Sequence, residues 1–201
     1  MFSDFCRYLD SILNHCPALY IHTYIRVHSL PLVLRIYNLS KSARDEVFER
    51  ASQVLSNATF KSKDLKIAES DDGTLAIIFD SNVGLYLGRR NDSKEFLFPL
   101  LKDEVILPKL PTVTVDIGAI KFVCNGANIM RPGIIKVEGD FTKSSLVLVR
   151  EQKYSKAIAV GRSLLSRAEL ESAAKGSVVE NLHYVGDRFW EALKEVAESK
   201  A

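Results

Sequence analysis

Apolar and polar residues alternate over short stretches in the first half of the chain, a pattern that is typical of half-buried strands. The turn SDDG (70–73) separates two of these stretches, and Gly84 opens another. We therefore predict an antiparallel meander with one face buried. Its strands correspond to the runs LVLRIY (32–37), LKIAE (65–69), TLAIIF (74–79) and GLYLG (84–88).

The spacing changes to that of a helix over residues 42–55, where apolar residues recur every three or four positions. Ser40 and Ser42 are candidate N-caps for this helix. Asp45 lies three residues after Ser42, as in a capping box. The helix and the strands around it predict a small α+β domain.

A second pattern begins after Pro108 and Pro111, which mark a natural boundary. Short strand-like runs are interrupted here by two small helices, and Ser166 with Glu169 forms a capping box for the second helix. Many short strands with two inserted helices predict a compact, partly open barrel. Strands are expected at 113–117, 133–139, 145–151, 157–164 and 178–185, and helices at 118–126, 167–174 and 189–199.

The predicted fold class is α+β, with a small α+β domain followed by a mixed-β pseudobarrel that contains two short helices. A chain of 201 residues has room for two such domains. We expect an N-terminal extension over 1–31, the first domain over 32–110, the barrel over 111–191 and a C-terminal helix or tail over 192–201.

Residues 1–31 are rich in aromatic and apolar residues but contain no uninterrupted apolar run near the ~20 residues that a membrane span needs. Residues 2–13 have the spacing of a short amphipathic helix. That helix would suit a protein partner or a membrane surface, or it would pack as an extension of the domain. In a third interpretation, this stretch is a gene-start artefact and the chain begins between residues 27 and 33. We favour the artefact or the packed extension.

The composition is globular, with a mild basic excess. Lys and Arg number 27 against 25 Asp and Glu, which gives a net charge of +2. The segment 113–150 holds five basic and three acidic residues, so the excess lies in the second domain. Cys6, Cys16 and Cys124 have no paired spacing, which argues against a disulfide framework or a four-cysteine zinc site and favours a reducing, cytoplasmic compartment. We expect no metal and no cofactor.

No catalytic motif is visible in the sequence. It contains neither a GxSxG nucleophile elbow nor a glycine-rich phosphate loop. Asp116, Asp140 and Asp187 follow strands, where capping a turn is the common role of an aspartate. Cys124 has no histidine near it in sequence and is expected to be a buried structural thiol. We predict that the protein is not an enzyme.

The segment GAIKFVCNGANIMRPG (118–133) is the most informative, because three glycines and a proline specify backbone conformation rather than a packed face. Its glycines would let the backbone approach a ligand closely. Cations would pair with phosphates, asparagines would bond to bases or backbone, and Met130 would offer an apolar surface; these polar residues are Lys121, Asn125, Asn128, Arg131 and Lys136. A tight helix-to-strand turn would use the same glycines, so both interpretations stay open.

Two stretches of the chain resemble a known family. VDIGAIKFVCNGANIMRPGI (115–134) resembles the start of a PUA domain, a small RNA-binding pseudobarrel, and KGSVVENLHYVGDRFW (175–190) is similar to its closing strand and aromatic finish. Together they resemble the malignant-T-cell-amplified-sequence family of translation-associated proteins and its archaeal relatives. The resemblance covers residues 32–191 and implies a pre-PUA domain before the PUA pseudobarrel.

This resemblance implies a non-catalytic protein that binds RNA in a groove between the first PUA helix, its following loop and the last strand. Onto the near side it carries Lys121, Gly126, Ala127, Asn128, Met130, Arg131, Pro132 and Gly133. On or near the opposing strand it carries Asn181, His183 and Tyr184. Arg131 stands where the family's loop is less basic, which would favour contact with phosphate.

The resemblance also implies the partners. These are small-subunit rRNA and/or tRNA, bound during initiation, recycling or reinitiation, and a density-regulated-protein-like or SUI1-type protein supplied in trans. No membrane partner is expected. Two alternatives stay open: an accessory protein of RNA modification, and a protein-interaction adapter whose groove is vestigial.

Overall fold

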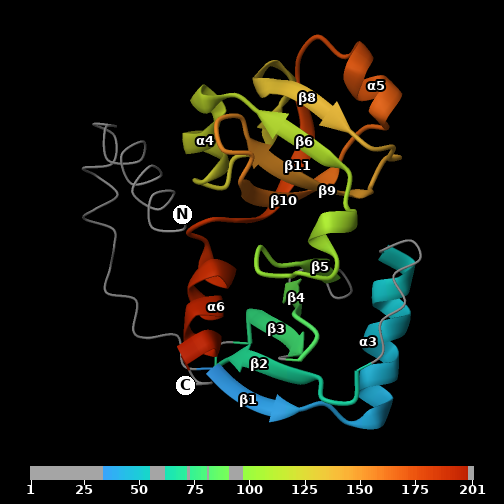
Figure 1. The fold of residues 1–201 in the computed structure, drawn as a ribbon, viewed down its shortest axis with the longest axis vertical. Helices are drawn as coiled ribbons and strands as arrows, with labels where there is room; N and C mark the ends of the chain where they lie inside the picture. Colours follow the sequence, from blue (N-terminus) through green and yellow to red (C-terminus); the bar gives the residue numbers. More distant parts are fainter. Residues whose placement is uncertain (1–33, 55–61, 72, 81, 91–96, 199–201) are drawn as a thin grey trace, which may run out of the picture. The chain divides into compact units, whose positions relative to one another are not determined.

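The computed structural model describes residues 34–54, 62–71, 73–80, 82–90 and 97–198. In this part of the chain, the first half forms a five-stranded antiparallel sheet whose strands follow one another in chain order (Figure 1). The predicted meander is therefore confirmed, whereas the extension 1–31 and its helix lie outside the described residues. The elements are β1 (Leu34–Asn38), α3 (Lys41–Val54), β2 (Lys66–Ser70), β3 (Leu75–Asp80), β4 (Leu85–Arg90) and β5 (Leu97–Pro99).

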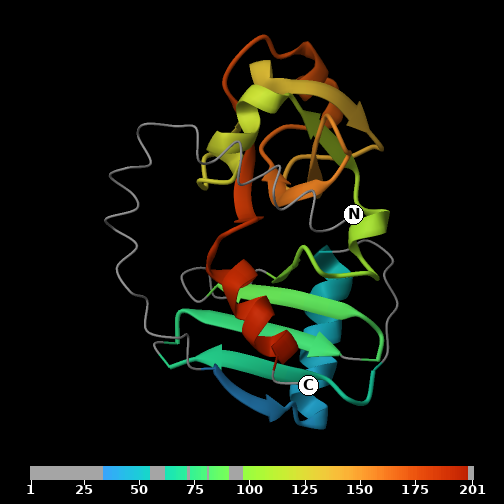
Figure 2. The same cartoon turned by 60° about the vertical axis from the view of Figure 1, so that its left-hand side comes forward.

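Both faces of this sheet are covered at its central strand, since every residue of β3 is buried. Helix α3 contacts β5, and α6 (Arg188–Glu198) contacts β3. The two helices lie on opposite faces of the sheet (Figures 1 and 2). The prediction of a single buried face was wrong, because the second cover comes from the far end of the chain. Arg188 at the start of α6 donates to Thr74 Oγ1 at 2.9 Å.

Helix α3 begins at Lys41, directly after Ser40, which is one of its two candidate N-caps. The Ser40 hydroxyl accepts a hydrogen bond from the Ala43 N–H at 3.2 Å, so Ser40 is the N-cap. The predicted capping box of Ser42 and Asp45 was wrong, because both residues already lie inside the helix. No helix in the described ranges combines the length and the apolar character that crossing a membrane takes.

The second half of the chain forms a six-stranded sheet in the order β7-β11-β10-β9-β6-β8, in which β6 pairs with β9 in parallel and the other pairs are antiparallel. The predicted α+β class, with a mixed-β half-barrel that contains two short helices, is confirmed. So is the capping box of Ser166 and Glu169. The elements are η1 (Leu107–Lys109), β6 (Thr112–Val115), α4 (Ile117–Val123), β7 (Ile129–Met130), η2 (Arg131–Gly133), β8 (Ile134–Glu138), β9 (Leu146–Glu151), β10 (Ala157–Ser163), α5 (Arg167–Ser172) and β11 (Ser177–Tyr184).

Asp187 joins the last strand to α6. Its carboxylate accepts hydrogen bonds from the N–H groups of Tyr184 (3.1 Å) and Trp190 (2.8 Å), so the expected capping role is confirmed. The same carboxylate lies 2.8 Å from His183 Nδ1. The His183 ring is buried, with ring centroids of Phe98 and Phe189 at 6.4 and 5.9 Å. The end of β11 therefore contacts the last strand of the first sheet. The predicted domain limits stay a prediction.

The segment between the two sheets is organised by Asp103, whose side chain is 2% exposed. The carboxylate accepts hydrogen bonds from the backbone N–H groups of Tyr86 (2.9 Å), Val105 (2.9 Å) and Ile106 (2.6 Å). Burial raises the pKa of Asp103 to about 6, although the backbone hydrogen bonds act in the opposite direction.

We predict that Asp103 makes the free energy of unfolding depend on pH. Because the pKa of Asp103 is raised in the folded state, its contribution is fully present below the ordinary value of 3.8 and is lost as pH rises through about 6. The loss amounts to about 3 kcal/mol at most. The carboxyl carbon resonance of Asp103 should titrate near pH 6, and a midpoint below pH 4 would contradict the prediction. Asp103→Asn should remove this part of the pH dependence.

Candidate functional site

Helix α4 is held at both ends by its own sequence. At its start, Asp116 is the N-cap and its carboxylate accepts from the Ala119 N–H at 2.8 Å, which confirms the expected capping role. At its end, the Gly126 and Ala127 N–H groups donate to the carbonyls of Val123 and Phe122. Gly126 has a φ of +84°, a left-handed conformation that commonly follows the end of a helix. The chain therefore leaves α4 in a fixed direction.

Asn181 of β11 fastens the following loop to the sheet. Its side-chain Nδ2 donates to the carbonyls of Val123 (2.9 Å) and Ala127 (3.1 Å). Its backbone N–H donates to Asn128 Oδ1 at 3.0 Å. These three bonds, which we call the Asn181 clasp, join residues more than fifty positions apart and set the position of loop 124–128.

Tyr184 packs beneath the same loop. A Cβ atom at Gly126 would lie 2.9 Å from the Tyr184 hydroxyl oxygen, so only glycine fits this position without a shift. Burial, followed by the charge of Asp187, raises the pKa of the Tyr184 hydroxyl above its usual range. Burial also raises the pKa of the nearby Cys124 thiol to about 12, as expected for a structural thiol.

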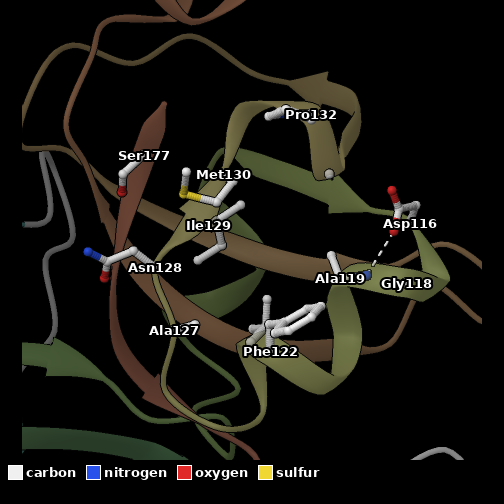
Figure 3. A pocket seen from close by; sticks show the side chains of 12 residues that line it. Asp116, Gly118, Ala119, Phe122, Ala127, Asn128, Ile129, Met130, Pro132 and Ser177 are labelled. Carbon is white, nitrogen blue, oxygen red and sulfur yellow. Dashed lines mark hydrogen bonds between the residues drawn. The ribbon is translucent and has the colours of Figure 1, made fainter. Parts of the chain in front are cut away.

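The clasped loop and α4 enclose a groove of about 730 Å³. Phe122 and Met130 are 57% and 50% exposed, which is unusual for large apolar side chains. Figure 3 shows them between Asn128 and Ser177 at one end and Asp116 at the other. A mostly apolar floor with polar groups at its ends suits a flat ring with a hydrogen-bonding edge. The lining residues are Asp116, Gly118, Ala119, Phe122, Val123, Ala127, Asn128, Ile129, Met130, Pro132, Gly133 and Ser177.

The predicted cations are placed differently from one another. Lys121 lies on α4, with Nζ 4.8 Å from the centroid of the Phe122 ring. Arg131 instead donates from Nε to the Leu170 carbonyl (2.9 Å) and from Nη1 to the Ile134 carbonyl (3.2 Å). Arg131 thus ties η2 to α5, and much of its guanidinium is occupied within the protein.

The structure brings most of the predicted site residues together. Five line the groove: Ala127, Asn128, Met130, Pro132 and Gly133. Lys121 flanks it, while Gly126, Asn181 and Tyr184 support its loop from behind. His183 lies on β11 as expected, but its side chain is 0% exposed and packs toward Phe98 and Phe189 rather than the groove. RNA contact by any of these residues stays a prediction.

Phe122 and Ser177 line the groove but were not among the predicted site residues. A signal for Phe122 was present, because Ile120 and Val123 form the buried side of this short helix. Phe122 does not lie on that buried side, so its aromatic ring faces solvent. Ser177 had no comparable signal, since it reaches the groove through the pairing of β11 with β7, where it lies opposite Met130.

The half-barrel and its helix–loop groove define a PUA-domain protein. The PUA domain family matches residues 111–185. The PUA domain is an RNA-binding fold, and the matched range contains every residue that lines the groove.

Relatives that match most of the chain, beyond the PUA domain, define the family more narrowly. An uncharacterized protein of Methanocaldococcus jannaschii is 33% identical over 153 residues, 75% of this chain and 87% of the relative. Translation machinery-associated protein 20 of Eremothecium gossypii is 31% identical over 157 residues, 75% of this chain and 84% of the relative. The crystal structure of a PUA domain from Aeropyrum pernix, a tartrate complex, has a TM-score of 0.68 at 28% identity and covers 81% of this chain and 92% of that chain.

The chain belongs to the PUA-domain family that includes translation machinery-associated protein 20 and the malignant T-cell-amplified sequence proteins. The resemblance seen in the sequence is thereby confirmed. The names of these relatives associate the family with translation, and none of them names an enzymatic activity.

We predict that Asn181→Ala destabilises the loop it holds. The substitution leaves the Val123 and Ala127 carbonyls without their side-chain donor, which costs about 1–3 kcal/mol of unfolding free energy. Amide hydrogen exchange should accelerate over residues 124–128. Asn125→Ala, at an exposed position of the same loop, is the matched control and should change neither quantity. Equal exchange in the two variants would show that the clasp does not hold the loop.

Proposed function

We propose that this protein is a non-catalytic RNA-binding protein of the translation apparatus. Its groove would bind small-subunit rRNA and/or tRNA during initiation, recycling or reinitiation in the cytoplasm. The observation that carries the proposal is the pre-formed groove of the PUA domain, with Phe122 and Met130 exposed inside it. The association of its relatives' names with translation supports the choice of RNA.

The chemistry of the groove supports recognition of an unstacked base. Phe122 presents an aromatic face, and stacking of a base on such a face contributes ~1–3 kcal/mol regardless of sequence. Lys121 lies beside that ring and supplies charge to an adjacent phosphate. Asn128 and Ser177 supply polar groups at one end of the groove. A stacked base with a paired phosphate fits a single-stranded or looped RNA better than a regular duplex.

The same lining supports binding rather than catalysis. Among the residues that line the groove, Asp116 is the one with a titratable side chain. Its Oδ1 already accepts the Ala119 N–H at the start of α4. General acid–base chemistry takes a side chain that is positioned to exchange a proton with a reacting group, and this lining offers no titratable side chain besides the capping Asp116. We further propose that a density-regulated-protein-like or SUI1-type protein acts with this chain in trans.

We predict that Phe122→Ala weakens binding to purified small ribosomal subunits or tRNA by about 5- to 100-fold, because the stacking face is removed. Lys121→Glu should weaken binding and lower the salt dependence by about one phosphate contact. Co-sedimentation in sucrose gradients and filter binding measure both effects. Arg131 is unsuitable for this test, since its substitution would also break two internal hydrogen bonds.

Two matched controls accompany these variants. Phe122→Tyr keeps the aromatic face and should retain binding. Lys41→Glu makes the same charge change at an exposed position on α3 and should have little effect. Failure of the unsubstituted protein to bind either RNA at low salt would refute the proposed function.

A further inference from the structure

The carboxylate of Asp116 lies at one end of the groove and is only half used within the protein. Asp116 is half-buried, and its Oδ1 accepts from the Ala119 N–H. The other oxygen, Oδ2, accepts no hydrogen bond from the residues that the structure describes. Figure 3 shows this second oxygen turned away from Ala119. The lining of the groove therefore includes a hydrogen-bond acceptor that a ligand could use.

The backbone around Asp116 holds this carboxylate in place and leaves it accessible. The Asp116 N–H donates to the Gly133 carbonyl at 2.9 Å. A Cβ atom at Gly118 would lie 3.2 Å from Asp116 Oδ1, and one at Gly133 would lie 3.1 Å from the Ala119 Cβ. Both distances are shorter than an ordinary contact, so the two glycines keep this end of the groove free of side chains.

Capping of α4 does not by itself explain why this residue carries a charge. Serine, threonine and asparagine are N-caps of similar quality, because the cap uses a single side-chain oxygen. The helix dipole favours an acidic cap by a modest amount. The same negative charge repels the phosphates of an RNA strand in the groove. A ligand group that donates hydrogen bonds gives the carboxylate a role there.

The spacing along α4 matches the size of a nucleotide. Asp116 and Phe122 are six residues apart, or about 9 Å along the helix axis. Side chains of a helix tilt toward its N-terminus, and Figure 3 shows the Phe122 ring directed toward Ala119. A base stacked on that ring, with one hydrogen bond of ~2.9 Å at its edge, spans the remaining distance.

The charges along α4 are arranged as a nucleotide would need them. Asp116 is negative at the start of the helix, whereas Lys121 is positive in its last turn, beside the Phe122 ring. A nucleotide has the complementary order, since its base edge carries donors and its phosphate is an anion. A lysine-rich peptide would supply donors to Asp116, but it has no flat ring for Phe122 and no anion for Lys121.

We propose that Asp116 selects bases that carry an exocyclic amino group, through a hydrogen bond from that group to Oδ2. This inference rests on the proposed function, since it concerns the base that stacks on Phe122. Cytosine presents an amino group at position 4, where uracil presents a carbonyl oxygen. The N3–H of uracil is flanked by two carbonyl oxygens, which the carboxylate repels. Cytosine should therefore bind more tightly than uracil.

The test compares fluorescent oligocytidylate and oligouridylate of equal length on the full chain, at pH 7.5 and low salt. Oligocytidylate should bind about 5- to 100-fold more tightly. An oligonucleotide of N4,N4-dimethylcytidine has no amino proton and should lose this advantage. Equal binding of cytidylate and uridylate, or full binding of the dimethylated strand, would overturn the inference. These comparisons need no variant of the protein.

Asp116→Asn tests the residue itself. Asparagine keeps an oxygen for the Ala119 N–H but replaces Oδ2 with an amide donor, so the preference for cytidylate should disappear or reverse. Asp140→Asn removes the same charge at an exposed position of the same domain and should keep the preference. An unchanged melting temperature shows that the cap of α4 is intact. A preference that persists in Asp116→Asn would overturn the role of this residue.

The outcomes separate this inference from the proposed function. If Phe122→Ala weakens both oligonucleotides and the two bind equally to the unsubstituted protein, base selection is overturned and the groove stands. Binding to small ribosomal subunits without binding to either oligonucleotide also overturns base selection. A labelled oligolysine peptide that depends on Asp116 and Phe122, while RNA depends on neither, would assign the groove to a basic protein and overturn both proposals.

Discussion

The side-chain amide of Asn181 holds the end of α4 and the loop after it against the last strand of the half-barrel. The rest of the site depends on this clasp, since loop 124–128 contributes one wall of the groove and supports the exposed Met130 that follows. Gly126 makes the arrangement possible, because the Tyr184 hydroxyl lies where a side chain would begin. The groove is therefore formed before any ligand arrives, and binding does not have to order it.

Several arginines make contacts within the protein, so few cations are left beside the groove. A net charge of +2 is small for a nucleic-acid binder, and several arginines serve the fold. Arg131 holds η2 to α5, and Arg162 pairs with Glu180 across the sheet at 2.6 Å. Lys121, beside the groove, instead lies with Nζ 4.8 Å from the centroid of the Phe122 ring. In the function we propose, base stacking with local phosphate pairing takes the place of a broad basic surface, so a nearly neutral chain is consistent with RNA binding.

Local features of the fold were readable from the sequence, whereas contacts between distant segments were not. The Ser166 capping box and the strand runs each depend on a few neighbouring residues, and the structure confirms them. The covering of the first sheet by α6 and the burial of His183 beside Phe98 depend on contacts between segments that are far apart in the sequence. Arg131 was expected to face phosphate because its charge was visible, but the carbonyls it binds are invisible in a sequence. Phe122 was missed for the opposite reason, since an apolar residue is assigned to a core by default.

Photo-crosslinking shows directly which part of the protein lies against RNA. Small ribosomal subunits containing 4-thiouridine would be irradiated with the protein, and crosslinked peptides would be identified by mass spectrometry. We expect crosslinks in residues 117–133, on α4 and the clasped loop. Crosslinks confined to residues 34–109 would contradict this expectation, because RNA would then be bound by the first domain rather than by the groove.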